Sequence, residues 1–317
     1  MQKNKSWRLR STVLNLDQPV VMGILNLTPD SFSDGGQFKE PKMDDFKVDL
    51  KAFEGGASHL IHSGAGILDV GGESTRPGAD PVGEEEELSR VIPAVRALVK
   101  RFDVPISVDT YRPAVAAAAL EEGASIINDV AAGRYDSKEK RIVVDRPVET
   151  EEMAEVVARY GAAVVLGHMC GVPKTMQENL VERGDRVVDE VFDFLVQRRD
   201  AFVKAGVDPA RIAYDPGIGF GKTLKENWTL MRETKRFAEL GPIVVGHSRK
   251  SLIKDVANRR YARLNDPDGA PSLIGLDFLT AQLSAMLAYR GVDVLRVHNV
   301  AATDLALELM RTEKEMR

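Results

Sequence analysis

Cysteine is almost absent from this chain of 317 residues: Cys170 is the only one, so no internal disulfide framework is possible. Long apolar runs are missing as well, and none reaches the roughly 18 residues that would indicate a membrane-spanning helix. The basic N-terminus, MQKNKSWRLR, lacks the apolar segment that follows in a secretion signal. From these absences we expect a cytoplasmic protein with no membrane partner.

A surplus of basic charge is also lacking. The net charge of −5 gives no reason to expect nucleic acid or an anionic membrane surface as a partner. Hydrophobic residues make up 44% of the chain and charged residues 29%, which is typical of a globular protein with a sizeable core. No nucleic acid is therefore expected among the partners.

Short apolar runs alternate with segments of helical periodicity along the chain. The runs cover 19–25, 66–70, 104–108, 124–127, 162–166, 211–214, 242–245 and 292–297. The candidate helices cover 44–63, 84–101, 112–122, 151–160, 178–205, 225–239 and 272–290. Continuous apolar strands are buried on both faces, as a parallel sheet covered by helices requires. Eight such strands predict an α/β fold, a single-domain (β/α)8 TIM barrel over residues 18–317, and the strand count favours it over a doubly wound open sheet.

Three segments fall outside the repeating pattern. Residues 1–17 are expected to form an N-terminal leader. A charged insertion at 135–151 separates the fourth strand from its helix, and a polar loop at 261–272 precedes the helix at 272–290. We expect both internal segments to be surface decoration and not parts of an active site.

The stretch DPGIGFGKT at 215–223 resembles a phosphate-binding P-loop at first sight. That motif needs a glycine five residues before Gly221, and this position holds Pro216. Proline has no backbone N–H to point at a phosphate. The stretch is therefore not a P-loop, and its aspartate and glycines need another explanation.

Polar side chains stand at nearly every strand end, where a (β/α)8 barrel carries its active site. Carboxylate and amide groups of Asp109, Asn128 and Asp215 suit a flat heterocycle rich in N–H donors. Arg76, Arg296 and His298 suit phosphate oxygens, and the neutral oxygen of Asn26 suits a Mg²⁺ that already carries phosphate ligands. Asp109 or Asn128 alone could equally be a helix cap or turn residue. Together these groups predict a pocket for a polar heterocycle joined to a phosphate or pyrophosphate.

Seven motifs carry a resemblance to a known family. They are GILNLTPDSFSDGG (23–36), DVGGESTRPGA (69–79), SVDT (107–110), IIND (126–129), DPGIGFGK (215–222), GHSRKS (246–251) and RVH (296–298). In this order, and over about residues 20–300, they resemble the dihydropteroate synthases. The resemblance implies a (β/α)8 barrel, a dimer formed through the late helices, and a pocket open to sulfonamide mimics. It also implies a transferase reaction that joins 6-hydroxymethyl-7,8-dihydropterin diphosphate to 4-aminobenzoate and releases pyrophosphate, a step towards folate.

The same resemblance implies roles for individual residues. The pterin would be held by Asp109, Asn128, Asp215 and Lys250, with Gly246 beside it and Phe220 over one ring face. The diphosphate would be held by Arg76, Arg296 and His298, and Mg²⁺ by Asn26. The aminobenzoate would be framed by Phe32, Thr75, Pro77 and Ser251. We expect the catalytic contribution to come from Asp109, Asp215, Lys250, Arg296 and His298. No dedicated base is expected, because an arylamine is already a usable nucleophile. Lys222 is expected to be a structural or electrostatic neighbour.

One departure from the family pattern concerns the fifth strand, where Gly167 stands in place of an expected pterin-packing methionine. We expect a thinner pocket wall there.

Two other functions stay open. A corrinoid-linked methyltransferase shares the barrel and the Asp/Asn/Asp pattern but has no use for the diphosphate residues, SFSDGG or STRPG. A non-catalytic pterin-binding relative is the second alternative, supported by Gly167 and the insertions.

Overall fold

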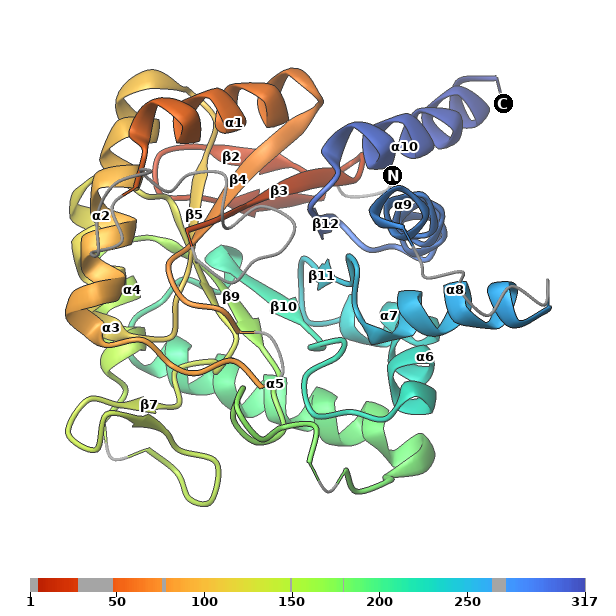
Figure 1. Cartoon of the computed structure of the whole chain (residues 1–317). Coiled ribbons are helices and arrows are strands. Elements are labelled where there is room, and N and C mark those ends of the chain that lie inside the picture. Colours follow the sequence, from red (N-terminus) through yellow and green to blue (C-terminus); the bar gives the residue numbers. More distant parts are fainter. Residues whose placement is uncertain are drawn as a thin grey trace.

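The computed structural model describes residues 5–27, 48–75, 78–148, 150–178, 180–263 and 272–316. Eight parallel strands follow one another in the order β10-β9-β6-β5-β4-β3-β12-β11 (Figure 1). The two edges of this sheet meet, because Tyr214 of β10 forms a parallel bridge with Ile243, next to β11. The backbone N–H of Tyr214 also donates to the carbonyl of Pro242 at 2.9 Å. The predicted (β/α)8 barrel is confirmed.

The elements alternate as the sequence predicts. The barrel strands are β3 (Val20–Asn26), β4 (Ala65–Gly71), β5 (Ile106–Asp109), β6 (Ile126–Asp129), β9 (Ala163–Gly167), β10 (Ile212–Asp215), β11 (Val244–Gly246) and β12 (Val294–Val297). The helices are α1 (Leu50–His62), α2 (Glu84–Arg101), α3 (Pro113–Glu121), α4 (Glu152–Tyr160), α5 (Val187–Lys204), α6 (Leu224–Arg232), α7 (Thr234–Phe237), α8 (Ser251–Arg263), α9 (Leu273–Tyr289) and α10 (Val300–Glu315), with 3-10 turns η1 (Gly184–Arg186) and η2 (Pro209–Arg211). The sequence patterns did not predict α8 or α10.

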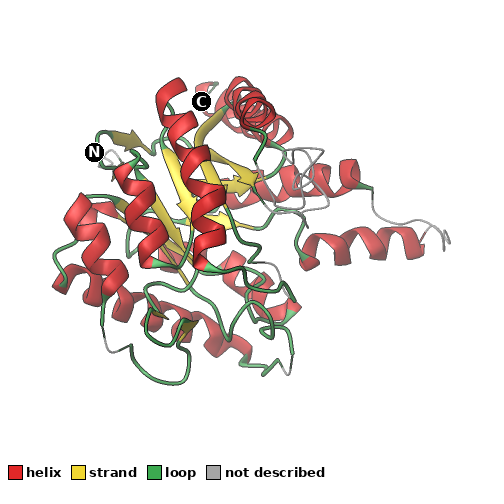
Figure 2. Ribbon diagram, turned by 60° about the vertical axis from the view of Figure 1, so that its left-hand side comes forward, coloured by secondary structure: helices red, strands yellow, loops and turns green. Residues whose placement is uncertain are grey.

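The strands bury both of their faces, which explains their continuous apolar runs. One side packs under the helices that surround the strands in Figure 2. The other side fills the barrel interior, where Met22, Ile67, Ile126, Val165 and Val294 form a separate cluster. The interior is therefore a packed core, and any ligand must bind at its end.

A hairpin within residues 1–17 closes one end of that core. Strands β1 (Ser6–Arg8) and β2 (Val13–Asn15) pair antiparallel. Trp7 is fully buried in the interior cluster, and its indole N–H donates to the carbonyl of Arg211 at 2.9 Å. The segment set apart as a leader thus contributes side chains to the barrel core.

The charged insertion at 135–151 forms a second small hairpin, β7 (Tyr135–Asp136) with β8 (Arg141–Ile142). Its charged side chains include the exposed Arg141. Tyr135 and Ile142, however, are buried in a cluster with Met176 and Phe220, which line the cavity described below. The insertion is therefore more than surface decoration, because two of its side chains belong to the same buried cluster as residues of the cavity wall.

No helix in the described ranges combines the length and apolar character needed to cross a membrane.

Candidate active site

A cavity of about 560 Å³ opens at the carboxyl ends of the strands, as the barrel fold predicts. The predicted site residues on its wall are Asn26, Thr75, Asp109, Phe220, Gly246, Lys250, Ser251, Arg296 and His298. Asn128 and Asp215 are buried at neighbouring strand ends and are not part of the wall. Phe32, Arg76 and Pro77 lie outside the described residues.

Strand register brings these side chains to one level. Asp109 pairs with Gly71 on one side and with Asn128 on the other. On the opposite wall Gly246 pairs with Arg296. The glycines carry no side chain into this layer, which leaves space between the polar groups of the strands beside them.

The centre of the site is a buried arginine shared by two carboxylates. Arg296 Nε donates to Asp69 Oδ2 at 2.6 Å, and its Nη2 donates to Asp109 Oδ2 at 2.7 Å. Asp69 is fully buried and also accepts from Ser107 Oγ at 2.5 Å and from Asn128 Nδ2 at 3.4 Å. Sequence reasoning missed Asp69, although a carboxylate inside the apolar run GILDV was a signal for it. Arg296 therefore holds these two buried carboxylates together and also faces the cavity.

Asp109 retains one free acceptor. Within the described part of the structure its Oδ1 is buried and has no hydrogen-bond partner. Burial raises the pKa of the Asp109 carboxyl to about 7, against the opposing effect of Arg296. A buried carboxylate oxygen without a donor is costly, so an N–H donor of a ligand would be stabilised at this point.

Asp215 is buried and is not on the cavity wall, but its charge interacts with that of Lys250, which lines the wall. Asp215 Oδ1 accepts from the backbone N–H of Gly217 at 2.7 Å. Burial raises the pKa of Asp215, and the nearby Lys250 lowers it. Lys250 Nζ lies 4.2 Å from the centre of the Phe220 ring and donates to the carbonyl of Ile218. Burial lowers the pKa of Lys250 to about 7. The Lys250 side chain thus covers one face of the Phe220 ring.

Basic side chains on the cavity wall include Lys254, Arg296 and His298, and they suit an anion. His298 Nδ1 lies 2.9 Å from Ser248 Oγ, which also accepts from the His298 backbone N–H at 3.3 Å. Ser251 begins α8, so the backbone N–H groups at the start of that helix are close to the same wall. Sequence reasoning missed Ser248, although it lies within GHSRKS.

The loop that carries Thr75 is anchored at its base. Glu73 accepts from Tyr111 Oη at 2.5 Å and from Arg112 Nη1 at 2.7 Å. Arg112 Nη2 also donates to the carbonyl of Val82 at 2.7 Å, so one arginine holds both ends of the 74–81 loop. This anchor was not predicted.

Gly167 does not thin the pocket wall as expected. A Cβ built there would lie 2.8 Å from the Cα of Val130 and 3.1 Å from the carbonyl oxygen of Asp129. The position faces the backbone that follows β6 and is not on the cavity wall. Glycine is therefore required by close packing of two neighbouring strand ends in this chain.

Metal-ligating residues are sparse. Within the described ranges, no group of three or more His, Cys, Asp or Glu side chains could hold a metal ion. Asn26, half-buried on the cavity wall, offers one amide oxygen. Such a site suits only a cation that brings other ligands with it.

Comparisons with known proteins agree with this geometry. A family model described as pterin binding enzyme matches residues 22–298. Dihydropteroate synthase of Synechocystis sp. is 39% identical over 283 residues, 89% of this chain and 86% of the relative. That of Haemophilus influenzae is 36% identical over 297 residues, 93% of this chain and 94% of the relative.

Solved structures show the same similarity in three dimensions. The Yersinia pestis dihydropteroate synthase in a sulfonamide complex matches with a TM-score of 0.80 and 33% identity, covering 98% of this chain and 99% of that one. The Xanthomonas albilineans enzyme with 4-aminobenzoic acid matches with a TM-score of 0.79 and 36% identity over the same shares. The Burkholderia cenocepacia enzyme complexed with 7,8-dihydropteroate matches with a TM-score of 0.76 and 33% identity, covering 99% of each chain.

Proposed function

The chain belongs to the pterin-binding enzyme family, and on that premise we propose how its own residues carry out the dihydropteroate synthase reaction. The activity is that of a transferase of folate biosynthesis: 4-aminobenzoate displaces pyrophosphate from the methylene carbon of the pterin diphosphate and gives 7,8-dihydropteroate. The observation that carries the assignment is identity of 36–39% with dihydropteroate synthases over about nine-tenths of the chain. The substrates are small molecules.

We assign pterin binding to the carboxylate side of the cavity. Asp109 Oδ1 lacks a donor, so it accepts from a ring N–H, and Asn128 and Asp215 offer further groups at neighbouring strand ends. Asp69 does not reach the cavity wall and acts by fixing Arg296. Lys250 and Gly246 complete the wall beside the ring.

The diphosphate is assigned to the cationic side. Arg296 and His298 face the cavity there, and Arg76 is assigned by resemblance because it lies outside the described residues. We propose Asn26 as the protein ligand of a Mg²⁺ held mainly by diphosphate oxygens and water. A Mg²⁺ ion bound in this way would neutralise part of the charge of the leaving pyrophosphate.

The reaction then needs positioning and charge, and no strong base. As the C–O bond to the diphosphate breaks, negative charge grows on the leaving oxygen, where Arg296 and His298 donate to it. Positive charge on the methylene carbon spreads into the ring, where the Asp109 and Asp215 carboxylates stabilise it. The amine of 4-aminobenzoate attacks this carbon and loses its proton after the new C–N bond forms.

The aminobenzoate is assigned to the mouth of the cavity. Thr75 and Ser251 lie there, and Phe32 and Pro77 are assigned by resemblance. Since the Yersinia pestis relative is solved with a sulfonamide drug and the Xanthomonas albilineans relative with 4-aminobenzoic acid, we propose that sulfonamides compete at the same place.

A homodimer is proposed on an apolar face of α9 and α10, which lie side by side at one edge of the molecule (Figure 1). Ile274, Phe278, Leu305 and Leu309 are 83%, 62%, 71% and 75% exposed. Exposed apolar side chains gathered in this way mark an interaction surface. Sedimentation velocity should show a dimer that Ile274→Glu with Phe278→Glu converts to monomer, and a monomeric wild-type protein would refute it.

A cytoplasmic location also stays a proposal, resting on the scarcity of cysteine.

Turnover with both substrates tests the activity. Pyrophosphate release that depends on 4-aminobenzoate is expected. Binding of the pterin alcohol without turnover of the diphosphate would favour the non-catalytic pterin-binding relative. The close backbone packing at Gly167 removes one reason for that alternative, because the glycine is required by the fold and is not part of the pocket wall.

A further inference from the structure

The turn that follows Asp215 presses on the backbone that follows β9. Gly217 has a left-handed backbone, φ 70°, and a Cβ there would lie 1.7 Å from the carbonyl oxygen of His168. Gly221, with φ 65°, would place a Cβ 2.2 Å from the carbonyl oxygen of Cys170. Only glycine permits this approach. The carbonyl groups of His168 and Cys170 therefore lie close against the 217–221 turn, and buried carbonyl groups need hydrogen-bond donors.

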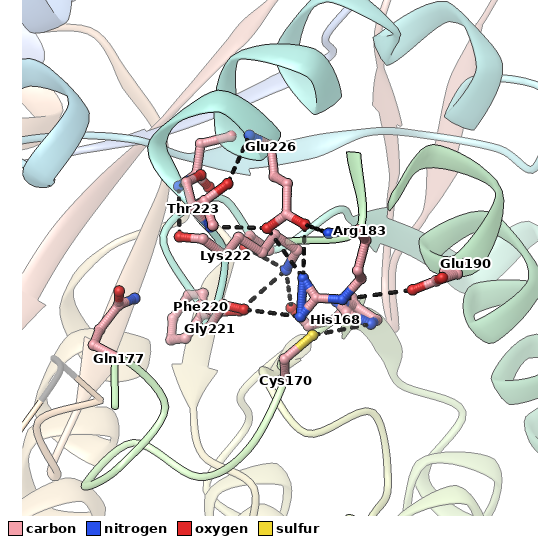
Figure 3. A network of polar contacts seen from close by, with 12 residues as sticks. His168, Cys170, Gln177, Arg183, Glu190, Phe220, Gly221, Lys222, Thr223 and Glu226 are labelled. Atoms are coloured by element: carbon pink, nitrogen blue, oxygen red, sulfur yellow. Dashed lines mark hydrogen bonds and ion pairs between the residues drawn. The ribbon is translucent and has the colours of Figure 1, made fainter. Parts of the chain in front are cut away.

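Lys222 supplies those donors. Its Nζ donates to the carbonyls of Gly217 at 2.8 Å, His168 at 3.2 Å and Phe220 at 3.2 Å. The side chain is 2% exposed, and Figure 3 shows it directed into the fold between the two segments. An ammonium group has three N–H donors, so each donor has one carbonyl acceptor. Lys222, which looks like part of a P-loop in the sequence, therefore joins two backbone segments through hydrogen bonds to their carbonyl groups.

The rest of the turn is held in the same manner. Lys250 donates to the carbonyl of Ile218, Gln177 Nε2 to that of Gly219 at 2.7 Å, and Arg183 Nη2 to that of Gly221 at 3.2 Å. Together with the bonds from Lys222, every carbonyl from residue 217 to residue 221 accepts from a side chain. The turn has a single defined shape only if these donors stay in place.

The charge of Lys222 also acts on the nearby carboxylate of Asp215. Burial lowers the pKa of Lys222 to about 8, while Cys170, Asp215 and Glu226 raise it and Arg183 lowers it further. Lys222 in turn lowers the pKa of Asp215 against the effect of burial. Its charge therefore helps to keep the Asp215 carboxylate ionised.

We propose that Lys222 is a positioning residue for pterin binding: its ammonium holds the 217–221 turn against residues 168–170 and thereby fixes the carboxylate of Asp215. The proposal rests on the function proposed above, in which Asp215 binds the pterin. Lys222 itself touches no substrate, since its three donors are used by the backbone and it is not on the cavity wall.

Lys222→Met keeps the length of the side chain and removes its donors. Lys225→Met is the matched control, because Lys225 is exposed on α6 and its ion pair with Glu182, at 3.6 Å, lies at the surface. Calorimetry with 6-hydroxymethyl-7,8-dihydropterin should show affinity lowered roughly tenfold or more in Lys222→Met and unchanged in Lys225→Met. In steady-state assays the KM for the pterin diphosphate should rise, while the KM for 4-aminobenzoate at saturating pterin diphosphate changes less than about twofold. A uniform loss of activity with both KM values unchanged would overturn the proposal.

Asp215→Asn separates this proposal from the proposed function. Normal pterin affinity in Asp215→Asn would refute the role of Asp215 and with it the action of Lys222 through that residue. Loss in Asp215→Asn with wild-type affinity in Lys222→Met would overturn the role of Lys222 alone. If Lys222→Met does not fold, Lys222→Gln is measured instead, because its amide keeps two N–H donors. Affinity reduced by roughly fivefold supports the proposal, and wild-type affinity overturns it.

Discussion

Replacing Arg296 by glutamine removes the cation that Asp69 and Asp109 share. Both carboxylates are buried, at 0% and 6% exposure, and no other cation donates to either of them within the described residues. Breaking a buried ion pair by removing one partner costs about 3–5 kcal/mol. For a chain of this length, that loss should lower the melting temperature by roughly 6–10 °C.

The pH dependence of the loss follows from Asp109. Burial already raises its pKa to about 7 although Arg296 lowers it, so removing Arg296 raises the folded-state pKa further. A carboxyl group with a raised folded-state pKa contributes most to stability at low pH and loses that contribution as pH rises through the folded-state value. The stability difference between wild type and Arg296→Gln should therefore be small near about pH 5.5 and large near about pH 8.

Urea denaturation of both proteins at these two pH values measures the difference. Arg96→Gln is the control, because it also removes an arginine, but one that is exposed and pairs with Glu122 at the surface. A variant as stable as wild type at the higher pH would refute the shared-cation argument. So would a deficit that grows as the pH falls. Pterin-alcohol affinity should also decline in Arg296→Gln, since Asp109 loses the group that orients it.

Three further outcomes are expected. Asp215→Asn should fold and bind the pterin alcohol more weakly, because an amide places a donor where an acceptor is needed, at about 1–3 kcal/mol for each buried group left unpaired; calorimetry on the folded variant checks this. Gly217→Ala should abolish pterin binding or folding, since its Cβ would lie 1.7 Å from the His168 carbonyl; circular dichroism and calorimetry decide between the two outcomes, and wild-type behaviour in both contradicts the geometry. 4-Aminobenzoate should bind weakly alone and more tightly with pyrophosphate and Mg²⁺, because the sequence segments 28–36 and 74–80 hold residues assigned to aminobenzoate and also Arg76, which is assigned to the diphosphate; equal affinities in the two titrations would contradict this coupling.

Local sequence patterns were sufficient for the barrel. A strand buried on both faces must be apolar throughout, so runs such as PVVMGIL and AAVVL are visible without any partner. The carboxyl end of such a strand is where a barrel carries polar groups, and Asp109 and Asn128 could be chosen as site residues for that reason. The N-terminal hairpin was missed because its three-residue strands are too short to show a pattern. The burial of Trp7 could not be predicted either, because it depends on contacts with the barrel interior.

The sequence by itself thus determined the alternation of strands and helices, the strand ends at which polar residues cluster, and the motifs of the family. Tertiary structure alone decided which of those residues touch one another. Arg296 and Asp69 are 227 positions apart and meet only because β12, β3 and β4 are neighbours in the closed sheet. The sequence predicted only that Lys222 is a structural or electrostatic neighbour, and the approach of residues 168–170 decided which carbonyls it contacts. Hydrogen bonds and ion pairs depend on distances of a few ångströms between side chains, and those distances are set by packing across the whole barrel and not by neighbours in the chain.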